Sequence, residues 1–484
     1  MAYRHGVYIS EVPTSIVPPV DTETGLPVVF GTAPVNLASD PAAVNTPTLC
    51  YTYAEAVAAF GYSDDWENYT LCEFLKSHFA LFAVSPVVLV NVLDPATHKT
   101  NVASQTVAMT SGVGTIADAG VVKSTLVVKL TAEGVPLNLG ADYTAAFDDD
   151  GKLVISRIAA STKLLANTAS VLVSFDKLNP AAVTKDEIIG GVDVNTGAYE
   201  GLELLNKVFP LTRLVPGMVL APSWSTDPEV AAVMVAKAGN INEHFRCLAL
   251  TDVPTDTVKK FTDVAAWKEN NNFTSPRQVV CWPKVKLGDD VYHLSTQLAG
   301  VICQTDAAND DIPYNSPSNK ALQANGAVLT DGTVVSLGPD QADYLNGQGI
   351  VTALNFVGGW KAWGNRTGCY PSNTDPKDAF IPVRRMFDWI GNTLVQTFWS
   401  KVDYPVNRRL IETIVDSCNI WLNGLTARQF ILGGRVEFLD TENPTTDLMD
   451  GIVKFHLYVT PPGPAREIDF ILEYDTAYLK TLFG

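Results

Sequence analysis

Short apolar runs alternate with helical segments in two separated stretches of the chain, residues 26–95 and 186–370. The strands expected in these stretches lie at 28–30, 87–92, 218–220, 247–250 and 279–282. The helices expected around them lie at 53–60, 66–82, 202–208, 228–238 and 258–269. Strands that alternate with helices in this way predict a parallel or mixed sheet covered by helices on both faces. We therefore expect one discontinuous central α/β domain built from both stretches.

Residues 96–185, which separate the two stretches, have a different composition. Val, Thr, Ser, Ala and Gly dominate, and aromatic residues are few. Strand-like runs recur in this segment, at 126–130, 143–147, 153–158 and 171–175. The sequence Asp148-Asp149-Asp150-Gly151 is typical of a hairpin turn between two of them. The segment therefore predicts a β-rich outer domain that is inserted into a surface loop of the larger domain.

Residues 371–464 predict a separate α+β domain. Apolar side chains recur at a spacing of three and four from Phe380 to Phe398, which is typical of one long amphipathic helix. A second helix begins near Leu410 and is expected to end at Asn423-Gly424. Strand-like runs follow at 434–439 and 452–459. The whole chain is thus expected to be an α+β multidomain protein.

Two arms, residues 1–25 and 465–484, carry a strand-like run at each end of the chain. The C-terminal run, 468–475, follows the stiff break Pro461-Pro462-Gly463-Pro464, and the N-terminal run precedes three prolines. A detachable strand suits exchange between neighbouring copies, because an added strand satisfies an open sheet edge. The alternative is that both runs fold back onto the chain's own sheet. The side chains expected to enter a neighbour belong to Val7, Ile9, Val12, Ile468, Phe470, Leu472 and Tyr474.

Length and charge limit the classes of function. A chain of 484 residues is expected to form about three domains. Its formal charge of −18 argues against a nucleic-acid-binding protein, which presents a basic surface. The most apolar stretch, 81–93, is too short to span a bilayer, and the first 13 residues lack the apolar core of a signal peptide. We therefore expect a soluble chain made in the cytoplasm, with no membrane insertion.

Motifs that carry catalytic or metal chemistry are absent from the sequence. It contains no phosphate-binding loop, no dinucleotide fingerprint, no HExxH and no GxSxG, and its six histidines are isolated. The seven cysteines are scattered without a CxxC, which predicts buried free thiols. Asp306, Asp310 and Asp311 could bind a cation, but a solvated loop is the preferred interpretation. We expect no enzyme, cofactor or metal, although a hydrolase site assembled from distant residues stays an alternative.

Several segments together resemble the contractile phage tail sheath family. Residues 299–306 with 316–320 are similar to a "TDA…SPAN" pattern of that family. Residues 344–350 and 359–367 are similar to its "LN..GI … WGARTL" region, and residues 3–13 to its "PGVYVxEV" start. Ser318, Asn365 and Gly368-Cys369 depart from these patterns. The resemblance covers most of the chain outside 96–185.

The resemblance implies a structural subunit of a contractile tail. Such subunits polymerise as stacked, typically hexameric, rings around an inner tail tube, and contraction drives the tube into a target cell. The implied partners are other copies of the chain, the inner tail tube protein, and the baseplate and tail terminator proteins, without direct nucleic-acid contact. The implied location is the virion tail, assembled in the host bacterial cytoplasm. A sheath of a related contractile injection system, a tailocin or secretion-type particle, is the first alternative, and a glycan-binding protein is a more distant one.

Within this interpretation three further groups of residues have expected roles. The receiving hairpin for exchanged strands is expected at Val436, Phe438, Val453, Phe455 and Leu457. The most basic patch is expected to face an acidic tube wall, although a solvated helix face or intramolecular ion pairing is the alternative. It comprises Arg384, Arg385, Arg408 and Arg409. The motif Trp363, Arg366 and Thr367 is expected to be scaffold, with a buried indole and an arginine that binds backbone carbonyls.

Overall fold

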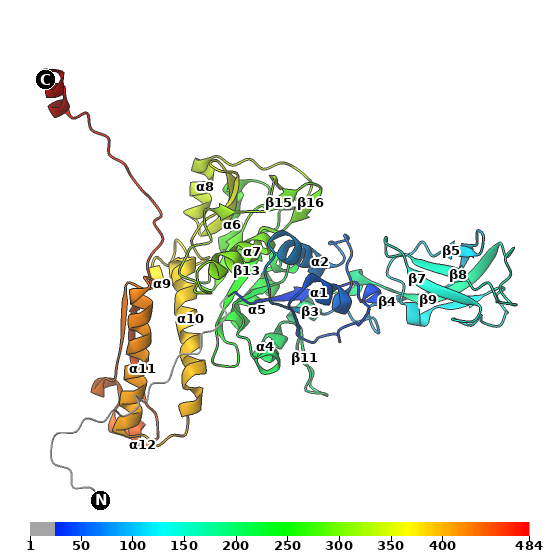
Figure 1. Cartoon of the computed structure of the whole chain (residues 1–484), viewed down its shortest axis with the longest axis horizontal. Coiled ribbons are helices and arrows are strands. Elements are labelled where there is room, and N and C mark those ends of the chain that lie inside the picture. The colour runs from blue at the N-terminus through cyan, green and yellow to red at the C-terminus, as the bar shows by residue number, and fades with distance from the viewer. Residues whose placement is uncertain (1–24, 484) are drawn as a thin grey trace, which may run out of the picture.

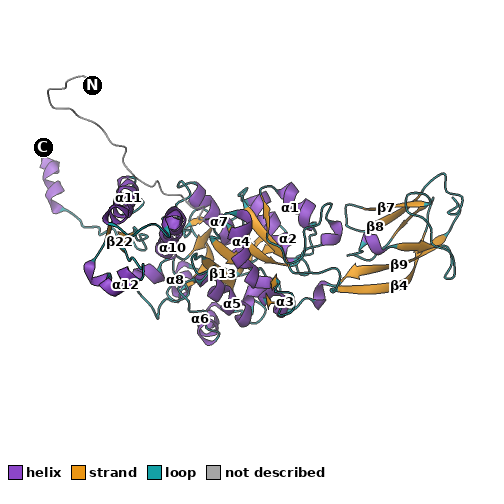
Figure 2. Cartoon of the chain, turned by 90° about the horizontal axis from the view of Figure 1, so that it is seen from below, coloured by secondary structure: helices purple, strands orange, loops and turns teal. Residues whose placement is uncertain are grey.

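The computed structural model describes residues 25–483, which form an elongated molecule with three parts in a row (Figure 1). A large mixed sheet with helices on both faces lies in the middle. A β-rich part lies at one end, and a pair of long helices with a small hairpin lies at the other. Figure 2, turned by 90°, shows the same order, with α10 and α11 at the end opposite to β4 and β9.

The central sheet has nine strands in the order β17-β20-β19-β14-β13-β12-β1-β3-β2. The six strands from β19 to β3 are parallel, and antiparallel strands close both edges. The parallel strands are almost wholly buried because helices cover both faces, as the apolar runs predict. The strands are β1 (Pro27–Gly31), β2 (Thr48–Cys50), β3 (Val87–Asn91), β12 (Met218–Leu220), β13 (Leu248–Asp252), β14 (Gln278–Cys281), β17 (Lys320–Ala321), β19 (Ile350–Asn355) and β20 (Trp360–Trp363).

Helices and short ribbons complete this part. The helices are α1 (Tyr53–Phe60), α2 (Thr70–Leu75), α3 (Lys185–Ile189), α4 (Leu205–Thr212), α5 (Pro228–Gly239), α6 (Phe261–Asn270), α7 (Leu294–Ala307) and α8 (Pro339–Asn346). The ribbons are β10 (Gly191–Val192) with β11 (Tyr199–Glu200), and β15 (Lys284–Leu287) with β16 (Asp290–Tyr292) and β18 (Gly326–Val328). The helix expected over 66–82 begins only at Thr70, because Thr32 binds the first turn: its hydroxyl accepts from the Thr70 amide at 3.1 Å. A π-helical segment, Lys76–Leu81, follows α2.

The outer β-rich part consists of two three-stranded sheets around a core of its own. All four strands expected here are present, and β4 and β5 are additional. The chain enters through β4 and leaves through β9, which pair along almost their whole length from Lys99↔Leu178 onward. The strands are β4 (Lys99–Ala108), β5 (Val113–Thr115), β6 (Val127–Lys129), β7 (Tyr143–Phe147), β8 (Leu153–Arg157) and β9 (Ser170–Leu178).

The C-terminal part is built on two long helices, α10 (Ile381–Phe398) and α11 (Arg408–Ala427), preceded by the short α9 (Pro376–Ala379). Strand β21 (Gly433–Glu437) pairs with β22 (His456–Thr460), and α12 (Thr445–Met449) lies in their connection. The second helix does not end at Asn423-Gly424: the buried Leu425 extends its apolar stripe by another turn. The last strand begins at His456 rather than at Ile452, because the Asn443 side chain binds the amide and carbonyl of Lys454 and holds an irregular connection.

Candidate functional site

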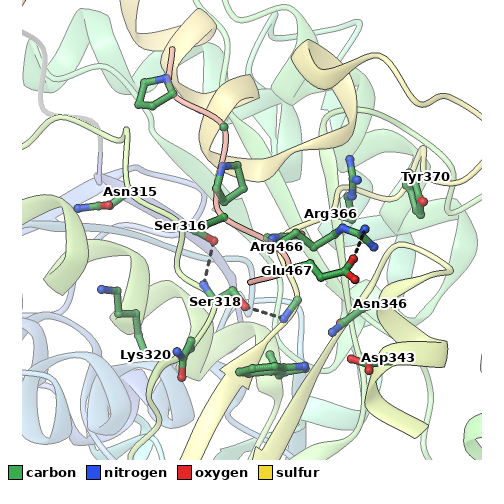
Figure 3. A pocket seen from close by; sticks show the side chains of 18 of the residues that line it. Asn315, Ser316, Ser318, Lys320, Asp343, Asn346, Arg366, Tyr370, Arg466 and Glu467 are labelled. Atoms are coloured by element: carbon green, nitrogen blue, oxygen red, sulfur yellow. Dashed lines mark hydrogen bonds and ion pairs between the residues drawn. The ribbon is translucent and has the colours of Figure 1, made fainter. Parts of the chain in front are cut away.

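The two motifs that carry the family resemblance meet in one groove of about 780 Å³ (Figure 3). Ser316 and Ser318 line one wall, and Trp363, Asn365 and Arg366 line another. The motifs also bind each other directly: the Ser318 hydroxyl accepts from the Gly364 amide at 3.0 Å, and the Asn319 amide donates to the Ala362 carbonyl at 2.6 Å. The segment 462–467, the start of the C-terminal arm, closes the groove.

The motif Trp363, Arg366 and Thr367 serves packing, but not in the expected manner. Trp363 is half-buried at the end of β20, and the Thr367 hydroxyl donates to the Asp378 carbonyl at 2.6 Å. The Arg366 guanidinium stacks over the rings of Phe380 at 3.7 Å and Tyr370 at 4.3 Å. The expectation that Arg366 binds backbone carbonyls is therefore wrong, and the cation–π geometry replaces it. Burial, and to a smaller extent the nearby Arg466, lower the pKa of Arg366.

Beyond the groove the C-terminal arm leaves the body of the molecule (Figure 1). Ile468, Phe470, Leu472 and Tyr474 are exposed and form no strand, and Ile471 is 95% exposed. A short 3₁₀ segment, Thr476–Phe483, ends the described chain. The alternative that the C-terminal run folds back onto the chain's own sheet is therefore wrong. Val7, Ile9 and Val12 lie outside the described residues.

The hairpin expected to receive exchanged strands is present as β21 and β22, with Val436 opposite Leu457. Val436 is buried against α11, while Leu457 and Phe455 are partly buried at the margin of the same apolar cluster. Phe438 stacks on Phe455 with ring centroids 5.8 Å apart, just beyond the paired strands. Val453 precedes β22 and does not take part in the hairpin.

Asn419 on α11 also belongs to the hairpin, although the sequence analysis did not identify it. Its side chain accepts from the Val436 amide at 2.8 Å and donates to the Val436 carbonyl at 3.1 Å. In the sequence Asn419 lies between Val415 and Leu422 at helical spacing. A polar residue within an apolar helical stripe could have indicated this contact, because an amide placed among apolar side chains requires a hydrogen-bonding partner.

Arg384 and Arg385 do not form a surface patch. Both side chains are buried at the start of α10, and Arg385 is only 5% exposed. Arg385 binds both oxygens of Asp306 on α7, so Asp306 is not in a solvated loop as expected. Burial alone would lower the pKa of Arg385, but Asp306 outweighs this effect and raises it. Ion pairing within the chain, the alternative considered from the sequence, is the observed arrangement.

The same ion-pair network continues to the sheet. Arg384 pairs with Asp378 at 3.2 Å and with Asp388 at 2.9 Å, and Arg277, just before β14, pairs with Asp388 at 2.5 Å. A buried guanidinium and its carboxylates constrain each other's positions, because separating either one leaves an uncompensated charge. The network therefore fixes α10 to the central sheet.

Arg408 and Arg409 lie elsewhere, at the start of α11. Arg408 is 91% exposed, and its ion pair among the described residues is with Glu412 of the same helix, at 2.6 Å. Because α10 and α11 run antiparallel (Figure 1), the starts of the two helices lie at opposite ends of the pair. The four arginines are thus two separate groups.

A buried polar cluster that was not predicted from the sequence lies at the end of β13, in the middle of the central sheet. His293 Nδ1 is 2.8 Å from Glu73, and the Ser295 hydroxyl donates to Asp252 at the end of β13. Burial raises the pKa of Glu73, but the facing His293 outweighs it and lowers the pKa overall; burial raises the pKa of Asp252. Histidine and serine contact different carboxylates, so the geometry is not that of a Ser-His-Asp relay.

Three further features of the described residues bear on function: the cysteines, possible metal ligands and the length of apolar helices. All seven cysteines are free, and six of them are buried. Within residues 25–483 no three His, Cys, Asp or Glu side chains converge in a way that could hold a metal ion. Over the same range no helix combines the length and apolar character needed to cross a membrane.

The chain was compared with known proteins. It is 27% identical to the tail sheath protein of Burkholderia phage BcepMu over 492 aligned residues, which cover 100% of this chain and 99% of the relative. The chain is a relative of the tail sheath proteins. No family model matches it.

Solved structures share the fold of this sheath relative. The sheath of the PVC extracellular contractile injection system, in its contracted state, has a TM-score of 0.58 at 14% identity over 99% of both chains. A chain of the six-fold symmetrised baseplate of the anti-feeding prophage has a TM-score of 0.56 at 16% identity, covering 98% of this chain and 100% of that one. The chain is therefore similar over its whole length to a tail sheath protein, and it shares a mixed α/β fold with proteins of contractile injection systems.

Proposed function

We propose that this chain is the sheath subunit that polymerises as stacked hexameric rings around an inner tail tube and contracts to drive the tube into a target cell. The tail sheath protein of the Burkholderia phage supports this assignment by full-length similarity. The fold shared with a contracted sheath supports it independently. The six-fold symmetry named for the related baseplate supports hexameric rings and a baseplate partner.

The observation that carries the proposal is the exposed C-terminal arm. Its apolar side chains, with Leu472 94% exposed, alternate with Asp469, Ile471, Glu473 and Asp475, and the run joins no sheet of the described residues. Exposed apolar runs of strand-forming residues mark surfaces that another chain covers. The hairpin β21–β22 in the same part of the molecule offers sheet edges for that purpose. We infer that the arm of one subunit adds a strand to the hairpin of another.

This arrangement suits a sheath that changes length. Subunits that rotate past one another need connections that survive the movement, and inserted strands provide them through backbone hydrogen bonds. The prolines at 461, 462 and 464 make the start of the arm a semi-rigid spacer. The energy for contraction comes from a metastable extended lattice, whose subunits bury more surface in the contracted form.

The shape of the subunit suggests its orientation in the tail. The C-terminal part faces the tube, and the outer β-rich part at the opposite end points to the solvent and is dispensable for the lattice. Arg408 and Arg409, exposed on an acidic chain, bind an acidic tube wall. The baseplate and the tail terminator bound the polymer at its ends, and the role is structural, without a cofactor. Assembly takes place in the host cytoplasm and yields a virion tail.

Removal of the arm tests the proposal. A chain that ends at Glu467 is expected to remain a folded monomer that forms no tubes in negative-stain electron microscopy, while the full chain forms striated hollow tubes. The matched pair is Phe470→Asp with Leu472→Asp, which places charges on the apolar face, against Asp469→Ala with Glu473→Ala on the other face. The first pair should prevent tubes and the second should allow them. Normal tubes from the truncated chain would contradict strand exchange.

The sheath of a related injection particle is the second candidate, and the fold shared with the PVC sheath favours it. Nucleic acid inside purified particles distinguishes the two: a genome-carrying tail contains it at the head, whereas an injection particle does not.

A further inference from the structure

The two outer edges of the β21–β22 hairpin differ. In an antiparallel pair the residues alternate between those whose amide and carbonyl face the partner strand and those whose groups face away. The Asn419 side chain on α11 binds both the amide and the carbonyl of Val436, so the backbone groups of Val436 face away from β22. Counting along β21 from that position, Gly434 and Val436 direct their backbone groups away from β22.

Asn419 occupies the place of a missing strand on the β21 edge. It binds both the amide and the carbonyl of Val436, as a paired strand would. Val436 is one of the two residues of β21 whose backbone groups face outward. The side-chain amide of Asn419 therefore already occupies the amide and carbonyl of one of these two residues. An edge that is already hydrogen-bonded gains little from a further strand, because the new strand must first displace the existing partner.

The β22 edge is open. Leu457 and Val459 are opposite Val436 and Gly434, so their amides and carbonyls face away from β21. Among residues 25–483, β21 and β22 pair only with each other. The Leu457 and Val459 side chains are partly buried at the margin of the cluster around α10 and α11. An added strand would therefore satisfy the backbone groups of β22 and extend its apolar face.

We propose that strand addition is directed to the outer edge of β22, and that Asn419 closes the edge of β21. The added strand is residues 468–475 of a second copy, and this assignment rests on the strand exchange proposed above. Its period of two places Phe470 and Leu472 on the face of Leu457 and Val459. Its acidic residues then lie on the face of Arg435, whose guanidinium is over the Tyr458 ring at 4.0 Å.

A matched pair of proline substitutions tests the choice of edge. Proline removes an amide and blocks the approach of a strand, but costs little where the amide faces away from its own hairpin. Val459→Pro on β22 is expected to abolish tubes in electron microscopy, and Gly434→Pro on β21 is expected to preserve them. Because a Cβ at Gly434 would meet the Tyr458 carbonyl at 3.2 Å and Ile431 and Leu422 at 3.3 Å, Gly434→Ala measures that crowding separately. Circular dichroism establishes that each variant is folded.

Each outcome is informative. Tubes from Val459→Pro but none from Gly434→Pro would overturn the proposal, and so would loss of tubes in both folded variants, which would mean that both edges receive strands. Tubes from both variants would contradict strand exchange at this hairpin altogether.

Hydrogen exchange of the unmodified chain gives an answer that does not depend on the folding of a variant. On assembly, peptides that cover residues 457–459 should become protected from exchange, and those that cover 434–436 should change little. Asn419→Ala supplies the complementary result: it opens the edge of β21, so association monitored by light scattering should become faster and less regular. Unchanged association of this variant, or protection confined to 434–436, would refute the role of Asn419.

Discussion

The starts of α10 and α11 have similar sequences but different surroundings in the folded chain. Each helix has two adjacent arginines in its first turns, where a positive charge is unfavourable to the helix dipole. Arg384 and Arg385 are buried, and each pairs with a carboxylate outside α10, Asp378 and Asp306 respectively. Arg408 is exposed, and its ion pair among residues 25–483 is with Glu412 of its own helix. The first pair therefore serves the fold of the subunit, and the second is free for another molecule.

The difference follows from the position of the carboxylates. Asp306 is 79 residues before Arg385 in the chain, and only the packing of α7 against α10 brings them together. Groups held by the chain's own contacts should control stability, and groups left exposed should control assembly. Substitutions at these sites test this distinction.

The largest expected effect is at Arg385. Arg385→Ala leaves Asp306 buried without its partner and should lower the free energy of unfolding by about 3–5 kcal/mol. Chemical denaturation of the monomer measures it. Arg428→Ala, which breaks an exposed pair with Asp310, is the control and should stay within about 1 kcal/mol of the unmodified chain. An equally small effect at Arg385 would contradict the role assigned to the buried network.

An effect that is absent at neutral pH and grows as the pH falls is expected at His78, which follows α2 and is wholly buried. Burial lowers the pKa of His78 from 6.5 to about 3. The unfolded chain then binds a proton that the folded chain does not, so stability should fall as the pH decreases from about 6.5 toward 3. The slope is about 1.4 kcal/mol per pH unit. Unfolding curves of His78→Phe, whose ring can stack on Phe74 as the imidazole does, should lack this component. Equal slopes for both chains between pH 6 and about 4 would show that His78 does not contribute.

The smallest effect on stability is expected at the exposed pair. Arg408→Glu with Arg409→Glu should leave the unfolding curve unchanged. If the proposed contact with an acidic tube wall exists, the reversed charges should prevent assembly on purified tubes. Lys259→Glu with Lys260→Glu, another exposed adjacent pair, is the control and should still assemble. If tube-dependent assembly survives the arginine substitutions, the exposed arginines do not control assembly, and the distinction between the two helix starts is wrong on that point.

The sequence predicts elements well where apolar spacing is regular. Residues 53–60 form α1 with the expected bounds, and α10 begins one residue after the expected start. It predicts them poorly where polar residues form a strand: β4 reads Lys-Thr-Asn-Val-Ala-Ser-Gln-Thr-Val-Ala and is mostly exposed, so no apolar period marks it. The strand forms because its backbone pairs with β9, a contact that its own side chains do not reveal.

The candidate site shows the same limit. The hairpin was predicted because strands have a period of two, which depends on neighbouring residues alone. The same period predicts a strand at 468–475, which stays a prediction. The burial of Asp306 and Arg385, and the contact of Asn419 with Val436, depend on packing between helices and strands that are distant in the chain. The partners of a charged or amide side chain are therefore the part that a single sequence does not specify.

The paired strands at the base of the outer β-rich part have a practical consequence. The Asn179 amide donates to the His98 carbonyl at 2.9 Å, so the chain departs and returns at the same place. Excision of residues 99–178 leaves ends that a tight turn can join with little loss of chain entropy. The same two positions can accept a foreign domain whose termini are adjacent. A tail built from such subunits would display one copy of a grafted enzyme or antigen per protomer, in a helical array whose spacing changes on contraction.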